Sequence, residues 1–238
     1  GRITGGDSFY QSPTDMGVNR AGFAIVDDDV TKEAAKQEIL RRYFRYRCEY
    51  AMGFADKETV QRVELFMKDF GIRPEDRTVV RPAWEAARQG QALDKGNEGI
   101  FCGAAIQLKD GTIITGNNSP LMHASSSLVL HAVKHLADIP DKIKLLPDTI
   151  TNAVRNMKTD ILNEKTVSLD LEETLIALSI SATTNPAAQL AIEKLTELRN
   201  CEVHMTHIPT PGDEAGLRRL GVNLTSEPHF STKNLFMP

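Results

Sequence analysis

The sequence predicts an α/β protein in which a helical subdomain precedes a three-layer αβα subdomain. Apolar residues recur at three- and four-residue spacing between Val30 and Gly90, which is typical of amphipathic helices. After Gly99, short β-like runs alternate with helical segments, which indicates a sheet covered by helices. The composition, with 41% hydrophobic and 25% charged residues, is that of an ordinary globular protein.

The first part of the chain is expected to be helical. Residues 31–52 carry an apolar stripe, and Asp56 is a suitable N-cap for a second helix that ends at Gly71. Pro82 stands at a helix-opening position and is followed by a short helical run. The Gly-rich, polar stretch at residues 90–99 is the best linker in the sequence.

The second part is expected to begin with a β-hairpin, because Asp110-Gly111 separates two β-like runs at 103–108 and 112–115. Ser119-Pro120 predicts a helix that runs to about residue 137, with Ser119 as its N-cap. Further helices are expected at 147–158, 171–183, 186–199 and 213–220, and strands at 201–208 and 222–226.

These patterns divide the chain into four parts. Residues 1–29 start at Gly1 in what reads as mid-domain sequence, so we expect them to be the end of a preceding domain in a longer protein. Residues 30–97 form the helical subdomain, 98–228 the αβα subdomain and 229–238 a tail.

Charge and cysteine usage exclude several classes of function. The net charge of −4 provides no basic field for nucleic acid or an anionic membrane. No apolar run approaches the ~20 residues of a membrane span. The three cysteines are far apart and include no CxxC pair, which favours a reducing, cytoplasmic location over disulfides or a thiolate zinc site.

Six strings of the sequence closely match a bacterial family: SPTDMGVNRAG (12–22), VDDDVTKEAAKQEILRRY (26–43), KDGTIITG (109–116), HLADIPDKIKLL (135–146), LEETLIALSISATTNPAAQLA (171–191) and RRLGVNLTSEP (218–228). On these strings the chain resembles the C-terminal half of the Domain of Unknown Function 1846 family, from about residue 8 to residue 228. The resemblance implies a bacterial cytoplasmic protein whose longer relatives carry a nucleotide-binding-like domain on the N-terminal side. It implies no defined activity, although members have been labelled ATP-dependent peptidases or hydrolases.

The passage from the hairpin into the next helix resembles the layout of zinc-dependent cytidine deaminases. Those enzymes carry His-Ala-Glu on the helix and a later Pro-Cys-x-x-Cys. Here His123-Ala124-Ser125 has Ser in place of the proton-shuttling Glu, and the CxxC is absent. The sequence therefore predicts a deaminase-like fold that lacks the zinc site, and no cofactor or metal is predicted.

Polar residues at helix starts are the candidate ligand-binding groups, because the first N–H groups of a helix attract anions. The alternative for each is a local role as a helix cap, a turn or a hydrogen-bonded small-residue face. The two groups are also expected to face one cleft. The candidates are Gly116, Asn117, Asn118, Ser119, Ser125 and Ser126 around the first helix of the second part, and Thr184 and Asn185 before residue 186.

Catalytic candidates are few. Asp15, in the turn Ser12-Pro13-Thr14-Asp15, is a general base only if another part of the protein buries it. His123 is the other candidate. No GxSxG elbow identifies a serine nucleophile.

A run of arginines marks the first helix. Arg41, Arg42, Arg45 and Arg47 indicate either a phosphate clamp or partner surface, or a solvated face with pairs such as Glu38–Arg42 and Arg45–Glu49.

The leading functional interpretation is part of a nucleotide- or phosphometabolite-binding protein with a possible hydrolase role. Its partners would be a small anionic molecule and the N-terminal domain of the same protein. The first alternative is a non-catalytic, homo-oligomeric structural module. The second is an ATP-dependent peptidase, which rests on the family label alone, because no peptidase dyad is recognisable in the sequence.

Overall fold

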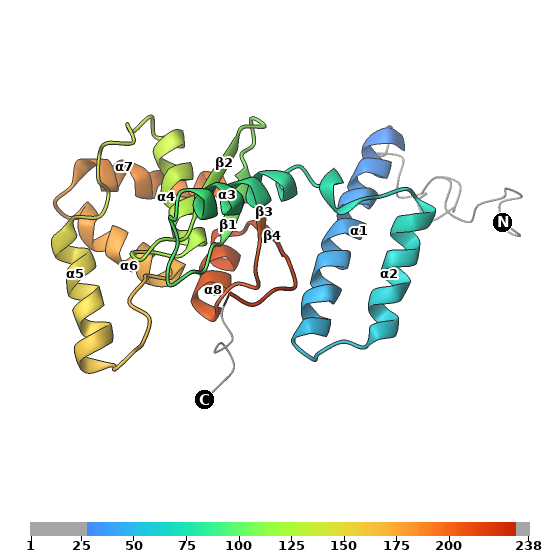
Figure 1. Cartoon of the computed structure of the whole chain (residues 1–238). Helices are drawn as coiled ribbons and strands as arrows, with labels where there is room; N and C mark the ends of the chain where they lie inside the picture. The colour runs from blue at the N-terminus through green and yellow to red at the C-terminus, as the bar shows by residue number, and fades with distance from the viewer. Residues whose placement is uncertain (1–27, 232–238) are drawn as a thin grey trace, which may run out of the picture.

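The computed structural model describes residues 28–231, in which helices surround a four-stranded mixed sheet (Figure 1). The strand order is β2-β1-β3-β4. Helices α1 and α2 stand side by side at one end of the molecule, and α5 to α7 lie at the other end. The predicted α/β class is confirmed, whereas the deaminase-like arrangement stays a prediction.

The elements follow the sequence pattern closely in both parts of the chain. The helices are α1 (Asp28–Ala51), α2 (Lys57–Asp69), α3 (Val80–Ala92), α4 (Ala124–Leu136), α5 (Asp148–Asn156), α6 (Leu171–Ala182), α7 (Pro186–Lys194) and α8 (Pro211–Leu220). The strands are β1 (Gly103–Gln107), β2 (Ile113–Asn117), β3 (Glu202–Met205) and β4 (Asn223–Ser226). Short irregular helices occupy Pro74–Asp76, Met157–Ile161 and Leu195–Leu198.

Helices α1 and α2 form an antiparallel pair, and local sequence signals mark both ends of α2. The Asp56 carboxylate accepts the Thr59 N–H at 2.7 Å, as its N-cap position predicts. Helix α2 ends just before Gly71, whose backbone lies in the left-handed region with φ of +63°. Leu40 and Phe44 of α1 pack with Met67 of α2 in a separate apolar core.

The sheet combines a hairpin with a crossover. β1 pairs antiparallel with β2 across the predicted Asp110-Gly111 turn, and also antiparallel with β3. β3 and β4 are parallel, and α8 makes the connection that two parallel strands require.

Helices cover both faces of the sheet. Ile106 of β1 points into the main core with α4 and α6, whereas the neighbouring Ala105 packs against Val79 and Ala83 at the start of α3. Adjacent residues of a strand face opposite sides, so α3 and α4 lie on opposite faces of β1. Because α3 contacts the sheet, packing crosses the expected boundary at residue 97, and that division stays a prediction.

One helix start differs from the sequence prediction. The α4 helix begins at Ala124 and not after Ser119. The Ser119 hydroxyl accepts the N–H groups of Leu121 and Met122, both at 3.2 Å, and so stabilises a turn. The next residues are extended, and the His123 N–H donates to the Leu169 carbonyl. Pairing with the segment before α6 therefore delays the helix.

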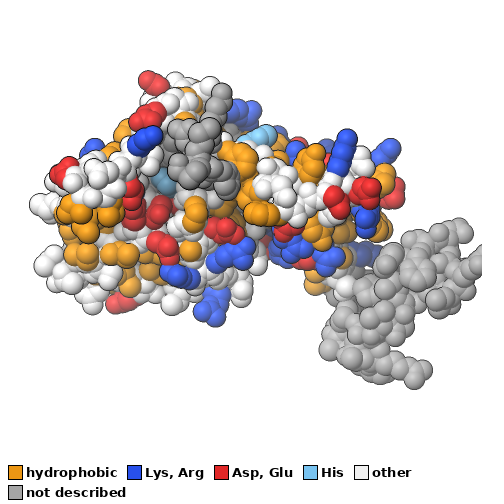
Figure 2. Space-filling view, turned by 90° about the horizontal axis from the view of Figure 1, so that it is seen from below, with side chains coloured by type: hydrophobic (Ala, Val, Ile, Leu, Met, Phe, Trp, Pro, Cys, Tyr) orange, Lys and Arg blue, Asp and Glu red, His pale blue; other side chains and the backbone are white. Residues whose placement is uncertain are grey.

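The surface carries several exposed apolar side chains at the α5–α7 end, where Figure 2 shows hydrophobic groups gathered at the left. Ile176 and Ile180 of α6 are 61% and 50% exposed, and Leu190 of α7 is 50% exposed. Within residues 28–231, no helix combines the length and the hydropathy that crossing a membrane requires.

We predict that Gly116→Ala destabilises the fold by about 2–3 kcal/mol, because overpacking a rigid contact strains the backbone. A Cβ at this position would lie 2.4 Å from the Leu128 nitrogen and 2.8 Å from the Ala124 carbonyl oxygen of α4. Urea unfolding measures the change. Thr115→Ala on the same strand is the control, with an expected loss under about 1 kcal/mol. Equal midpoints for the two variants would contradict the packing role of Gly116.

Candidate functional site

The carboxylate of Asp213 is fully buried and accepts four hydrogen bonds. Its Oδ1 accepts the Ser125 hydroxyl at 2.6 Å and the Leu171 N–H at 3.0 Å. Its Oδ2 accepts Nδ1–H of His123 and the Thr210 hydroxyl, both at 2.8 Å. A buried carboxylate is stable only when its acceptor sites are filled in this way.

The donors to Asp213 come from the starts of three helices. Ser125 is in the first turn of α4, Leu171 is the first residue of α6, and Thr210 is the N-cap of α8. Each helix start presents N–H groups and the positive end of a helix dipole. The single negative charge of Asp213 therefore lies where three positive helix ends meet.

Burial and these partners have opposite effects on the pKa of Asp213. Burial raises it, but the hydrogen bond and charge of His123 and the hydroxyls of Ser125 and Thr210 bring the pKa below its ordinary value. For His123, burial lowers the pKa, and the hydrogen bond and charge of Asp213 then raise it above its ordinary value. The pair therefore favours an ionised Asp213 and a readily protonated imidazole.

The orientation of His123 follows from this contact. Its Nδ1 is held by Asp213, and its Nε2 has no hydrogen-bond partner among residues 28–231. The side chain is 24% exposed, so that Nε2 can meet solvent or a ligand. A buried carboxylate that fixes one ring nitrogen leaves the other free to accept or donate a proton.

A second carboxylate stands beside this pair. Asp170 caps α6 by accepting the Glu173 N–H at 2.9 Å, and burial raises the pKa of its side chain. Its charge also contributes to the raised pKa of His123. Gly212 approaches the Asp170 carboxylate so closely that a Cβ there would lie 2.1 Å from Oδ2. A side chain at residue 212 would therefore have to displace the Asp170 carboxylate from its place beside α8.

His207 lies near the same charges but is shut off from water. It is 5% exposed, its Nδ1 has no hydrogen-bond partner, and burial lowers its pKa to about 4. The imidazole is therefore neutral near pH 7 and is not a candidate for proton exchange with solvent.

The structure brings two of the sequence candidates, His123 and Ser125, together on Asp213. Ser126 instead donates to the Leu169 carbonyl at 3.2 Å. Asn118 is a structural clamp that accepts the Cys102 N–H and donates to the Ile100 carbonyl.

The other candidates beside α4 also have packing or turn roles. Gly116 packs against α4, Ser119 stabilises the turn before it, and Asn117 lies against Gly90 at the end of α3.

The second group of polar candidates lies elsewhere. Asn185 caps α7 by accepting the Ala187 N–H at 3.0 Å, and it donates to the Lys144 carbonyl in the loop that follows α4. Thr184 is exposed. Ser119 precedes the first turn of α4, whereas Lys144 lies in the loop after its last turn, and the expected common cleft stays a prediction. Asp15 lies outside the described residues.

Sequence reasoning missed Asp213, Thr210 and Asp170. Thr210-Pro211-Gly212-Asp213 has the pattern of a helix start with a local cap, and the Asp213 N–H does donate to the Thr210 hydroxyl at 3.3 Å. This local role hides the contact with His123, which is 90 residues away in the chain. Within residues 28–231, no three His, Cys, Asp or Glu side chains form a group that could hold a metal ion.

Comparison with known proteins defines the class to which this chain belongs. Residues 1–71 match "Domain of unknown function DUF1846, N-terminal", and residues 75–236 match "Domain of unknown function DUF1846, C-terminal". The chain is 48% identical over 235 residues to a UPF0371 protein of Clostridium botulinum strain Alaska E43, and 46% identical over 236 residues to one of strain Langeland. Each alignment covers 99% of this chain and 47% of the relative.

The chain therefore belongs to the DUF1846 family, as the sequence resemblance predicted. The match corrects its extent, since the family covers the whole chain and the first 71 residues match the N-terminal part of the family rather than its C-terminal half. The chain spans about half the length of the curated relatives it matches.

We predict that Asp213→Asn destabilises the protein by about 2–4 kcal/mol, because it removes a buried charge partner and turns an acceptor into a donor. His123→Gln should cost only about 1 kcal/mol, since Asp213 keeps three donors. Urea unfolding gives both values, and the exposed Asp141→Asn is the control with a change under about 0.5 kcal/mol. A loss for Asp213→Asn no larger than that of the control would show that the carboxylate does not hold the helices.

We predict that stability falls as the pH drops from 6.5 to 4. The folded-state pKa of His207 is about 4, below its ordinary value of 6.5. The folded chain therefore binds fewer protons than the unfolded chain in this window, and a contribution of about 3 kcal/mol is lost toward pH 4. Burial also lowers the pKa of His204, which acts in the same direction.

Urea unfolding between pH 7 and pH 4 measures this dependence. His207→Gln should flatten the fall of unfolding free energy, whereas His131→Gln, at an exposed position, should keep it. An unchanged slope in His207→Gln would contradict the role of burial.

Proposed function

We propose that the chain carries an acid–base site in which Asp213 orients His123 for proton transfer. The observation that supports this most is the 2.8 Å bond between the buried Asp213 carboxylate and Nδ1 of His123, with Nε2 left unpartnered among the described residues. The carboxylate keeps the imidazole in one tautomer and stabilises its protonated form. Although burial lowers the pKa of His123, the hydrogen bond and charge of Asp213 raise it above its ordinary value, which favours the protonated imidazole as a proton donor.

The proposed substrate is a small anionic molecule, a nucleotide or another phosphorylated metabolite, and the proposed reaction is its hydrolysis. Protonated His123 would attract such a group. The N–H groups of Ala124, Ser125 and Ser126, which follow His123 at the start of α4, have no acceptor within residues 28–231. These three residues are fully buried, so their N–H groups add positive potential beside His123 and do not contact a ligand themselves.

The cellular setting is part of the same proposal. The chain would act in the cytoplasm, together with an N-terminal domain of the same protein, and its coverage of only 47% of a longer relative leaves room for such a domain. The deaminase-like arrangement is also a proposal, supported by the β1–β2 hairpin that leads through His123 into α4.

A second candidate function is a non-catalytic assembly module. It is supported by Ile176 and Ile180, which lie one turn apart on α6, and by Leu190 on the adjoining α7, all of them at least half exposed. Apolar groups on two adjacent helices are a common basis for contact between copies of a chain.

The test is a screen of nucleoside phosphates and sugar phosphates for thermal stabilisation and phosphate release. We expect at least one compound to raise the melting temperature and to be hydrolysed, with His123→Gln lowering the rate by about 10²-fold or more. His131→Gln on the same helix is the matched control and should keep the rate.

The outcomes separate the two candidates. If no compound stabilises or reacts, and Ile176→Ser with Ile180→Ser reduces the size of the species in gel filtration, the assembly module is the better description. Hydrolysis that survives in His123→Gln would remove the acid–base proposal while leaving a phosphorylated substrate in place.

A further inference from the structure

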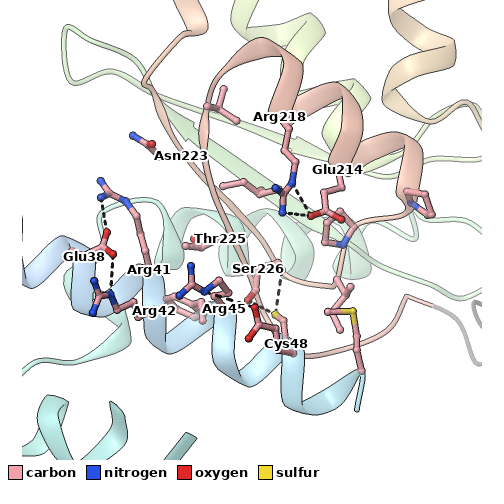
Figure 3. A pocket seen from close by; sticks show the side chains of 18 residues that line it. Glu38, Arg41, Arg42, Arg45, Cys48, Glu214, Arg218, Asn223, Thr225 and Ser226 are labelled. Carbon is pink, nitrogen blue, oxygen red and sulfur yellow. Dashed lines mark hydrogen bonds and ion pairs between the residues drawn. The ribbon is translucent and has the colours of Figure 1, made fainter. Parts of the chain in front are cut away.

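A pocket of about 560 Å³ lies between α1, α8 and the edge strand β4 (Figure 3). None of the four residues that donate hydrogen bonds to the Asp213 carboxylate lines it. Its α8 wall is made by Pro211, Glu214 and Arg218, at three- and four-residue spacing, whereas Asp213 and Leu217 of the same helix are buried in the core. The pocket is therefore separate from the proposed acid–base site and occupies another face of α8.

Four arginines from distant parts of the chain surround this pocket. Arg41, Arg42 and Arg45 come from α1, and Figure 3 shows them on the opposite side of β4 from Arg218 of α8. Three of the arginines singled out in the sequence thus line one pocket with a fourth that lies more than 170 residues away in the chain. A solvated helix face alone would not produce this convergence.

The arginines keep unused hydrogen-bond donors. Arg42 binds Glu38 through Nε at 2.9 Å, and Arg218 binds Glu214 through Nε and Nη2 at 2.9 and 2.6 Å. No residue within 28–231 accepts from the Nη atoms of Arg42 or from Nη1 of Arg218. Nε of Arg41 is buried without a partner. A ligand with several acceptor oxygens would satisfy the free donors of Arg42 and Arg218.

The acidic residues of the pocket are weak competitors for such a ligand. Glu38, Glu49 and Glu214 each pair with an arginine four residues away on the same helix, with both side chains at least a third exposed. Exposed pairs of this kind contribute little to stability. A phosphate can form bidentate bonds with arginine and carries more charge than one carboxylate, so it can bind beside these pairs or displace them.

The rest of the lining combines the polar residues Asn223, Thr225 and Ser226 of β4 with apolar side chains. Met52 of α1, Leu224 of β4 and the segment Ile208–Pro209 provide a wall without charges. A volume of this size suits a small molecule, and a mostly apolar wall with a few polar groups is typical of such sites. The ligand therefore needs an anionic end and a flat or apolar body.

We propose that this pocket binds a small phosphorylated ligand with an apolar ring system, such as a nucleoside monophosphate. The phosphate would lie among Arg42, Arg45 and Arg218, and the ring would lie against Met52 and Leu224. This assignment does not rest on the acid–base proposal, because neither His123 nor Asp213 lines the pocket and no pocket residue forms a hydrogen bond with the His123 side chain.

Calorimetric titration of the 238-residue chain with AMP, adenosine and inorganic phosphate tests the proposal. AMP should bind about tenfold more tightly than either fragment alone, since both parts of the pocket contribute. Arg45→Ala and Arg218→Ala, from opposite walls, should each weaken AMP binding about tenfold. Arg45→Lys keeps the charge and should still weaken binding, because lysine lacks the bidentate geometry.

Two controls make the result decisive. Arg62 of α2 forms a similar exposed pair with Glu58 but lies outside the pocket, so Arg62→Ala should bind AMP as the unchanged chain does. His123→Gln should also keep AMP binding, even where it abolishes turnover. The proposal is overturned if AMP does not bind at millimolar concentration, if adenosine or phosphate binds as tightly, or if folded Arg45→Ala and Arg218→Ala behave like Arg62→Ala.

Discussion

The buried carboxylate of Asp213 is the constraint on which the arrangement of this protein depends. An isolated charge in a protein interior is costly, and it is tolerated only where donors and positive potential surround it. Here four hydrogen bonds from three helix starts do so. Those bonds form only when α4, α6 and α8 converge. The buried charge therefore depends on the packing of the three helices, and its hydrogen bonds in turn hold their starts together.

This arrangement changes where an external anion is expected to bind. The positive ends of three helices are already close to an internal negative charge, and the loop residues Asn118, Ser119 and Asn185 satisfy local backbone groups. The remaining chemistry at this point belongs to His123, whose free ring nitrogen is partly exposed. The arginines of the pocket between α1, α8 and β4 lie on the face of α8 that is opposite to Asp213.

The connection between β3 and β4 links both regions. His207 follows β3, α8 carries Asp213 on its buried face and Arg218 on its exposed face, and β4 forms the floor of the arginine pocket. Arg77, 1% exposed, holds this unit to the helical part by donating to Glu202, Thr225 and the backbone of both strands. The two proposed sites therefore share one crossover as their support.

The sequence by itself determined the local elements, because their signals act within about four residues. The Asp56 and Asn185 caps, the Asp110-Gly111 turn and the apolar stripe of α1 all lie where the pattern predicted. The start of α4 was wrong because pairing with Leu169 overrode the local signal of Ser119-Pro120. Tertiary structure alone decided that Asp213 would meet His123 and that Arg218 would join the arginines of α1. Such contacts depend on how whole helices pack, and residues far apart in the chain carry no local pattern that specifies their pairing.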